Sequence, residues 1–232
     1  MKSISIWLFP EGPNPLKVLV VLEELQIPYE IKTIKMEDVK KVPLIKLNPN
    51  GRVLVIDDPN KGLILWESCA IITYLIDEYD TNNTLTYVAG NEKYLVNQWL
   101  YFQASGQGPY FGQAAWFMRL HPEKLQSAIE RYQNEIRRVM GVVEGHLSGR
   151  QWLVGDKMTC ADLAWVPWTL FGDILLSQSG HALLRDYPNV EAWYERIASR
   201  PSWKKVMEMR SRLLDSLYYC YTNLYENNMK FA

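Results

Sequence analysis

The sequence contains few of the residues that build metal centres and disulfide frameworks. Among 232 residues there are only three cysteines and three histidines. The cysteines, at positions 69, 160 and 220, lie far apart and fit no metal-ligand spacing. A small, odd number of cysteines favours a reducing compartment over a disulfide framework. We therefore expect no metal site, and we expect each cysteine to be a small core residue.

An excess of one charge and long apolar runs are also lacking. The 25 basic and 26 acidic residues give a net charge of −1, and the basic residues are scattered, which argues against a nucleic-acid partner. No uncharged apolar segment approaches about 18 residues, so we expect no membrane-spanning helix. The apolar stretch 4–9 ends at Pro10 and is too short for a secretory signal. These features predict a cytoplasmic protein.

The first third of the chain alternates between strand and helix patterns. Helices are expected at 15–25, at 39–47 and from residue 67 to about residue 79. Strands are expected at 3–9, 29–34, 52–56 and 63–66, with a turn at 57–62 joining the last two. This order fits a thioredoxin-like α/β domain, which we place at residues 1–83.

The rest of the chain shows helical periodicity only. Residues 81–89 are rich in Asn, Thr and Gly and are typical of a linker. Beyond them we expect an all-α C-terminal domain at residues 90–232. Its helices are predicted at 94–120, 122–147, from 159 onward, 190–199 and 202–225.

The most informative motif is Trp66-Glu67-Ser68, at the predicted junction of a strand and a helix. Unpaired backbone N–H groups and the helix dipole make a helix start a good carboxylate site. The Ser68 hydroxyl is a further donor, and the negative charge of Glu67 suits an ammonium group. The motif therefore predicts a site for an amino-acid zwitterion, such as the γ-glutamyl end of glutathione. An ordinary capped helix is the alternative.

A second helix start carries a folding signal with little catalytic content. Thr159 is followed three residues later by Asp162, just before an apolar run. In such a capping box the threonine hydroxyl caps a backbone N–H, and the acidic side chain reaches back to the N–H of the cap. We expect a structural role for both residues.

Three stretches of the sequence carry a resemblance to a known family. They are Asn48-Pro49-Asn50-Gly51-Arg52-Val53, Trp66-Glu67-Ser68, and the run from Trp152 to Asp162. In sequence and spacing they resemble the three signatures of the cytosolic glutathione transferases, over nearly the whole chain. The resemblance implies a glutathione-transferase fold, glutathione as the thiol cosubstrate and a two-fold homodimer.

Two further stretches, 97–106 and 130–139, resemble the fungal group typified by the yeast nitrogen-regulator prion protein. The polar N-terminal extension of that protein, and its long insertion before the Trp152 stretch, have no counterpart in the sequence. A prion-like or transcription-regulating role therefore has little support in the sequence. Fungal family members in secondary-metabolite pathways are the more relevant comparison.

One position departs from the family's glutathione site. The family carries a cis-proline after the valine that corresponds to Val53, and here that residue is Leu54. In the family, the backbone N–H and C=O of this valine pair with the cysteine of glutathione. The sequence leaves open whether the Val53–Leu54 bond is cis or trans. A distorted pairing would weaken glutathione binding without abolishing it.

The residue that activates the thiol is assigned by the same resemblance. Other groups of the family use Tyr, Ser or Cys at the start of the first helix, and residues 9–15 contain none of these. Asn14 matches the asparagine of the fungal group, and its amide can donate a hydrogen bond to sulfur. The thiol needs such help because it is mostly protonated at neutral pH. The structural alternative for Asn14 is an N-cap before Pro15.

Two other groups of residues complete the predicted site. Arg52, Lys40 and Lys41 are candidates for the glycine carboxylate of glutathione, with Arg52 favoured by the resemblance. A cleft between the domains, lined by aromatic rings and a few amides, is a usual small-molecule site. Aromatic residues at helical spacing are more often core residues, so we expect only a minority to contact a ligand. The candidates for an apolar substrate are Phe9, Gln107, Tyr110, Phe111, Trp116 and Trp168.

The predicted function is a glutathione transferase-like enzyme that activates the glutathione thiol for attack on an apolar electrophile. One alternative is a glutathione-dependent cis–trans isomerase of a polyene, which needs the same thiolate but consumes no glutathione. Another is a non-catalytic glutathione-binding or regulatory protein. The sequence leaves three alternatives open for the tyrosine-rich tail beyond Pro201. The tail covers the cleft, it packs against a partner subunit, or it is disordered from residue 227.

Overall fold

The computed structural model describes the backbone of residues 1–177 and 183–229, and side chains as far as residue 216 apart from that gap. Its first part is a four-stranded sheet in the order β2-β1-β3-β4. β1 pairs in parallel with β2 and antiparallel with β3, and β3 pairs antiparallel with β4. The strands are β1 (Ile4–Leu8), β2 (Tyr29–Thr33), β3 (Val55–Asp58) and β4 (Leu63–Trp66). The predicted thioredoxin-like architecture is confirmed.

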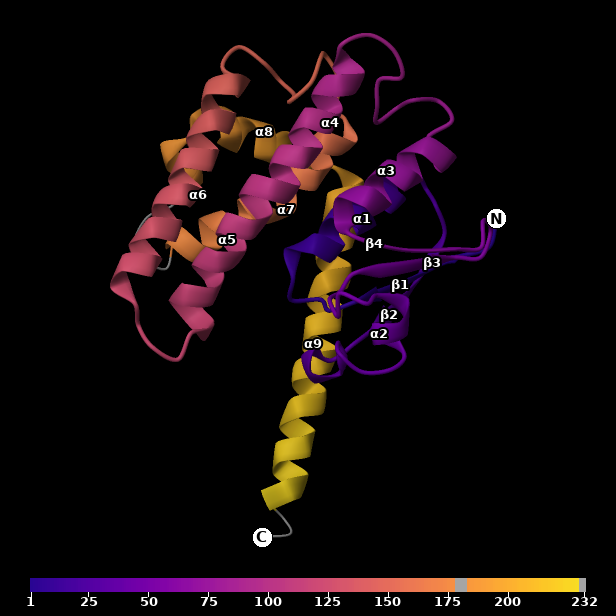
Figure 1. Ribbon diagram of the computed structural model, residues 1–232, viewed down its shortest axis with the longest axis vertical. Helices are drawn as coiled ribbons and strands as arrows, with labels where there is room; N and C mark the ends of the chain where they lie inside the picture. The colour runs from indigo at the N-terminus through magenta and orange to yellow at the C-terminus, as the bar shows by residue number, and fades with distance from the viewer. Residues whose placement is uncertain (178–182, 230–232) are drawn as a thin grey trace.

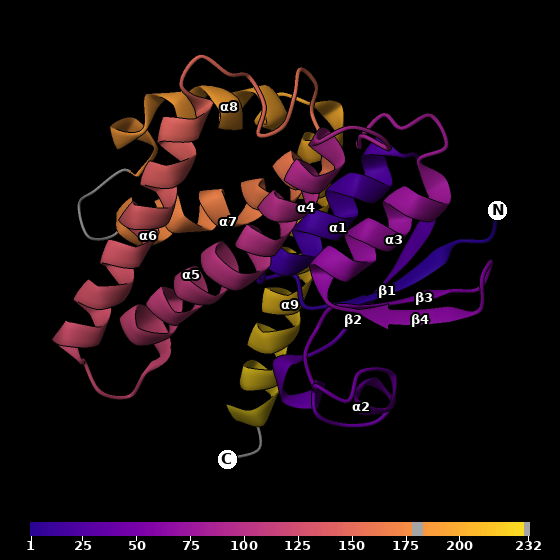
Figure 2. The ribbon, with the colours of Figure 1, turned by 45° about the horizontal axis from the view of Figure 1, so that its top comes forward.

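Helices cover both faces of this sheet. α1 (Pro13–Glu24) and α3 (Ser68–Tyr79) lie side by side on one face, and the short α2 (Leu44–Leu47) lies on the other (Figures 1 and 2). α1 is buried almost all round, because it is surrounded by the sheet, by α3 and by two helices of the second part, α7 (Cys160–Ser177) and α9 (Pro201–Met229). Its apolar run from Leu16 to Leu22 is what this environment requires.

Two predicted elements around the sheet differ from the structure. The helix expected at 39–47 is reduced to α2, preceded by a 3₁₀ turn at Met36–Asp38, because Pro43 lacks a backbone donor. The strand expected at 52–56 begins only at Val55. Asn48 Nδ2 donates to the Arg52 carbonyl at 2.7 Å, which keeps that carbonyl in a loop and out of the sheet.

The second part of the chain is helical, and it begins at Glu92 after a connection that follows Tyr79. The helix predicted at 94–120 is a single rod with two wider, π-helical turns, at Gln103–Gln107 and Trp116–Leu120. Such turns are frequent at functional sites. The α-helices of this part are α4 (Glu92–Phe102), α5 (Gly108–Ala115), α6 (Gln126–Leu147), α7 (Cys160–Ser177), α8 (Pro188–Ala198) and α9 (Pro201–Met229).

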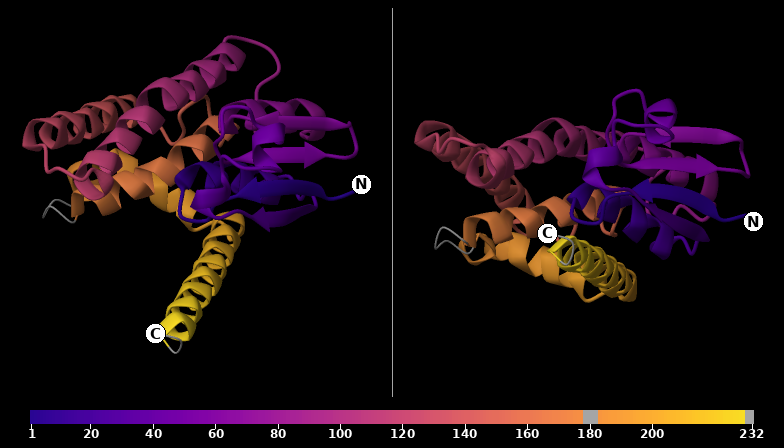
Figure 3. Two further views of the ribbon diagram at one scale, coloured as in Figure 1. Left: turned by 60° about the horizontal axis from the view of Figure 1, so that its bottom comes forward. Right: turned by 90° about the horizontal axis from the view of Figure 1, so that it is seen from below.

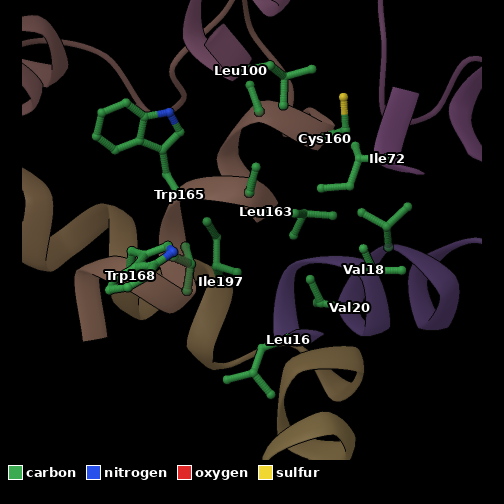
Figure 4. Packing of buried hydrophobic residues seen from close by; sticks show 14 of the residues in the cluster. Leu16, Val18, Val20, Ile72, Leu100, Cys160, Leu163, Trp165, Trp168 and Ile197 are labelled. Carbon is green, nitrogen blue, oxygen red and sulfur yellow. The ribbon is translucent and has the colours of Figure 1, made fainter. Parts of the chain in front are cut away.

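The apolar core is continuous between the two parts. α7 packs directly on α1 and α3, so Leu163 faces Val18 and Ile72 across the seam (Figure 4). The predicted capping box opens α7: Asp162 accepts from the backbone N–H of Thr159 at 2.8 Å. The threonine hydroxyl differs from the expectation, because it donates to the same carboxylate at 3.0 Å.

The C-terminal helix ties the two parts together and then leaves them. Near its start, Arg200 and Ser202 bind Glu24 at the end of α1, and the guanidinium forms an ion pair at 2.6 Å. Further along, Arg210 Nε donates to the carbonyl of Pro10 at 3.1 Å. The rest of α9 projects away from the cleft-lining helices α5 and α7 and does not cover them (Figure 3). The tail's tyrosine side chains and residues 230–232, part of the predicted disorder, lie outside the described residues.

Candidate active site

The β4–α3 junction has the geometry that the sequence motif predicts. β4 ends at Trp66, Glu67 is the N-cap residue, and Ser68 is the first residue of α3. Glu67 has a φ of +73°, a left-handed conformation that non-glycine residues adopt rarely. Both side chains border a cleft of about 630 Å³ between the two parts of the molecule. Anion donors and a carboxylate therefore lie together at one place in this cleft.

Asn14 lies in the same cleft, inside the first turn of α1. The helix begins at Pro13 with Gly12 as its N-cap, so the alternative role of Asn14 as an N-cap is wrong. Its Oδ1 accepts a hydrogen bond of 2.9 Å from the indole Nε1 of Trp168 in α7. An indole N–H can only donate, so it must face the amide oxygen. The amide Nδ2 of Asn14 is therefore left as a donor for the cleft.

A buried lysine lies one turn further along α1. The side chain of Lys17 is 2% exposed, and its Nζ donates to Ser68 Oγ at 3.2 Å and to Gln103 Oε1 at 2.5 Å. Burial lowers the pKa of Lys17 from 10.5 to about 8, although Cys69 and Glu67 favour its charged form. Burial raises the pKa of the neighbouring Cys69, so this thiol is unsuited to act as a nucleophile.

Two smaller hollows extend the cleft beyond Asn14. One, of about 70 Å³, is bordered by Arg52, Val53 and Leu54, and the Val53–Leu54 bond that the sequence left open is cis. The other, of about 460 Å³, is bordered by Lys40, Arg52 and Val53. The structure thus brings five of the six predicted glutathione-binding residues to one connected surface.

Lys41 is the exception among the predicted glutathione-binding residues. It borders none of these hollows and forms an exposed ion pair with Asp38 at 2.9 Å. The hydrogen bond that Lys41 donates to Asp38 raises the pKa of Lys41. The alternative interpretation of Lys41, as a solvated surface charge, describes its position.

The apolar candidates divide into two sets. Trp116 and Trp168 border the cleft beside Asn14, as predicted. Gln107 and Phe111 are fully buried and are not among the residues that border the cleft, so the structure gives no support to the prediction that they contact substrate. The amide of Gln107 bonds the Trp165 carbonyl and Thr169, and the Phe111 ring packs on Trp168. The helix turns these two side chains towards α7 and away from the cleft.

The other two apolar candidates are partly buried and are not among the residues that border the cleft. Tyr110 lies under the guanidinium of Arg138, 5.9 Å from the ring centre, and Phe9 precedes the loop to α1. Sequence reasoning missed Lys17, Cys69 and Gln113, which do border the cleft. A signal existed for Lys17, because it is the only charged residue in the apolar run from Leu16 to Leu22.

Two alternative classes of site find no support in the described part of the chain. No group of three or more His, Cys, Asp or Glu side chains there could hold a metal ion. No helix among those residues has the length and apolar character needed to cross a membrane. Among the described residues, the cleft beside Asn14, Glu67 and Ser68 is therefore the candidate site that we consider for a function.

Comparison with known proteins identifies the family. The model of the glutathione S-transferase N-terminal domain matches residues 2–77, and that of the C-terminal domain matches residues 108–201. The chain belongs to the glutathione S-transferase family. The glutathione S-transferase-like protein tpcF of Aspergillus fumigatus is 46% identical over 205 residues, which cover 84% of this chain and 91% of that protein.

Two further relatives place the chain within the family. The transcriptional regulator URE2 of Saccharomyces cerevisiae is 31% identical over 245 residues, covering 89% of this chain and 68% of that protein. The crystal structure of the glutathione transferase URE2P6 from Phanerochaete chrysosporium, in complex with oxidised glutathione, is 44% identical with a TM-score of 0.86. It covers 91% of this chain and 97% of that one. The predicted resemblance to the fungal group of the nitrogen regulator is confirmed.

Proposed function

We propose that this glutathione transferase binds glutathione in the cleft and activates its thiol for attack on an apolar electrophile. The observation that carries the proposal is the orientation of Asn14. Its amide oxygen is held by Trp168, so its N–H₂ group faces the cleft that Ser68 and Glu67 also border. A URE2-like relative that covers most of the chain binds oxidised glutathione.

Each part of the ligand has a chemically suited partner in the cleft. The γ-glutamyl carboxylate would bind at the start of α3 and Ser68, and its ammonium would bind Glu67. The backbone of Val53 would pair with the cysteine, and Arg52 or Lys40 would meet the glycine carboxylate. The sulfur would then lie beside the Asn14 amide, whose hydrogen bond favours thiolate over thiol. Trp116 and Trp168 offer an apolar surface for the electrophile.

The proposal is tested by measuring the thiolate. Ultraviolet difference absorbance and calorimetry would follow glutathione binding, and an activated aromatic halide would serve as the electrophile. We expect Asn14→Ala to lower kcat/KM about 10- to 100-fold, since a hydrogen bond to a charged atom is lost. The affinity for glutathione should change much less. Trp168→Phe, which removes the indole donor but keeps an aromatic ring, should give a smaller effect in the same direction.

The outcomes separate the candidate functions. An unchanged thiolate signal in Asn14→Ala would remove Asn14 from the mechanism, and no binding at millimolar glutathione would contradict the whole proposal. Binding without turnover of any electrophile would favour the regulatory alternative. A polyene whose double-bond geometry changes while total glutathione stays constant would replace conjugation by isomerisation.

We also propose that two copies of the chain form a homodimer through the outer side of α4. Tyr94 and Tyr101 are seven residues apart, so they lie on one side of the helix, and they are 71% and 74% exposed. Exposed apolar side chains of this kind are typical of an interface. Sedimentation should give twice the mass of the chain, and Tyr94→Lys with Tyr101→Lys should halve it.

A further inference from the structure

Lys17 differs from the lysines whose ion pairs the structure shows. Lys32, Lys41, Lys61 and Lys205 all pair with a carboxylate at the protein surface. Lys17 is buried, and among the described residues no Asp or Glu forms an ion pair with it. Lysine is almost never fully buried without compensation, because its charge loses the solvation of water. Among the described carboxylates, only the longer-range attraction of Glu67 offsets this loss, so no direct ion pair within the described residues explains the position of Lys17.

The contacts of Lys17 aim its charge at one end of the cleft. Its two hydrogen bonds go to Ser68 Oγ and Gln103 Oε1, which leaves the third ammonium hydrogen beside the cleft that Lys17 borders. A serine hydroxyl carries a single hydrogen. Because Ser68 Oγ accepts from Lys17, that hydrogen points away from the ammonium, and it can be donated to the neighbouring Cys69 sulfur or to a ligand.

A buried network holds the lysine in this position. Gln103 Nε2 donates to Gln107 Oε1 at 3.1 Å, and Gln107 Nε2 donates to Thr169 Oγ1 at 3.1 Å and to the Trp165 carbonyl. Each amide is thereby oriented, so the Gln103 oxygen faces Lys17. The network belongs to the helical part, whereas Lys17 and Ser68 belong to the sheet part. The ammonium therefore joins the two parts beneath the cleft.

We propose that Lys17 is a positioning residue that selects the α-carboxylate of the γ-glutamyl group, by orienting Ser68 and by supplying the positive charge that this carboxylate compensates. The inference rests on the proposed function and deepens it. A buried cation without an ion-pair partner, beside helix N–H groups, attracts a carboxylate more strongly than the helix end alone. The ligand, in turn, supplies the direct ion pair that Glu67, which acts on Lys17 only from a longer distance, does not form.

The charged groups around Lys17 affect the pH at which its ammonium loses a proton. Glu67 and Cys69 face it from the start of α3, and Arg52 borders the same cleft from the loop before β3. Its other neighbours are neutral: Gln103 in the π-helical turn and Trp168 in α7. With a pKa of about 8 the free protein loses the Lys17 proton just above neutral pH. A bound carboxylate should raise this pKa, so binding should take up protons near pH 8.

The test combines one substitution with ligands that differ by one group. Calorimetry would measure glutathione, glutaryl-Cys-Gly, which lacks only the ammonium, and 4-aminobutyryl-Cys-Gly, which lacks only the α-carboxylate. We expect Lys17→Met to weaken the first two about 10- to 100-fold and the third hardly at all. Lys204→Met, the same change at an exposed lysine, is the matched control. A loss shared equally by all three ligands would mean a merely structural role and overturn the inference.

A second measurement keeps the test valid even if Lys17→Met folds poorly. The S-methyl derivative of glutaryl-Cys-Gly carries neither thiol nor amine, so its own groups do not titrate near pH 8. Its affinity for the unmodified protein should fall about tenfold from pH 7 to pH 9.5, with proton uptake on binding. A flat profile would overturn the inference. If the unmodified protein bound no glutathione at all, the proposed function would fail too. If the unmodified protein and Lys17→Met bound glutathione with equal affinity, only this inference would be overturned.

Discussion

Lys17 and Asp162, two of the charged side chains that are buried among the described residues, are accommodated in opposite ways. Asp162, at the start of α7, is fully buried and accepts four hydrogen bonds, from the backbone of Leu153 and Thr159, the Thr159 hydroxyl and the indole of Trp193. Lys17 makes two hydrogen bonds and borders a cleft. A charge that the chain satisfies completely serves the fold. A charge left incompletely satisfied beside a cleft is available to a ligand.

The largest expected effect is on stability, at Asp162. Replacing it by Ala leaves four buried donors without an acceptor, and each unsatisfied group is costly. We expect Asp162→Ala to lower the free energy of unfolding by about 3–5 kcal/mol, which denaturant unfolding would measure. Asp162→Asn keeps one acceptor oxygen and should cost less than half as much. A loss below about 1 kcal/mol in Asp162→Ala would contradict the assignment of this charge to the fold.

The next effect is the contribution of Lys17 to the pH dependence of stability. The unfolded chain keeps this proton up to about pH 10.5, whereas the folded protein releases it from about pH 8. Between these values the unfolded state binds more protons, so stability rises with pH. Relative to Lys17→Met, the unmodified protein should gain about 3 kcal/mol across this window. Subtracting the two curves of unfolding free energy against pH cancels the contributions of all other titrating groups. If the two curves were parallel, Lys17 would not be a buried charge.

The difference between these two charges also explains what the sequence could predict. Asp162 lies three residues after Thr159, so its role is a local pattern, and the capping box could be read directly. The same holds for Glu67 and Ser68, which follow a strand and open a helix. The succession of strands and helices along the first third of the chain likewise follows from periodicity.

The contacts of Lys17 are not local, and no spacing rule predicts them. Gln103 is 86 residues away and Ser68 is 51 residues away, so their meeting depends on how the two parts dock. The same is true of Asn14 and Trp168, which are 154 residues apart. The burial of Gln107 and Phe111, which the sequence did not predict, has a related cause. An aromatic and amide-rich helix has residues on every side, and only packing against α7 decides which ones face the cleft.

The smallest expected effect comes from making Lys17 resemble Asp162, by giving it a partner within the chain. In Ser68→Asp a carboxylate would replace the hydroxyl that Lys17 now contacts, at a helix start where negative charge is favourable. We expect the free energy of unfolding to rise by about 1 kcal/mol while glutathione binding is lost, because the new carboxylate takes the place of the ligand's. Ser68→Ala is the control, since it removes the hydroxyl without adding a charge and should weaken binding without stabilising the fold. Ser68→Asp could instead bind glutathione as well as the unmodified protein does. Lys17 and Asp162 would then not differ in the way proposed, and the distinction between a buried charge that serves binding and one that serves folding would be wrong.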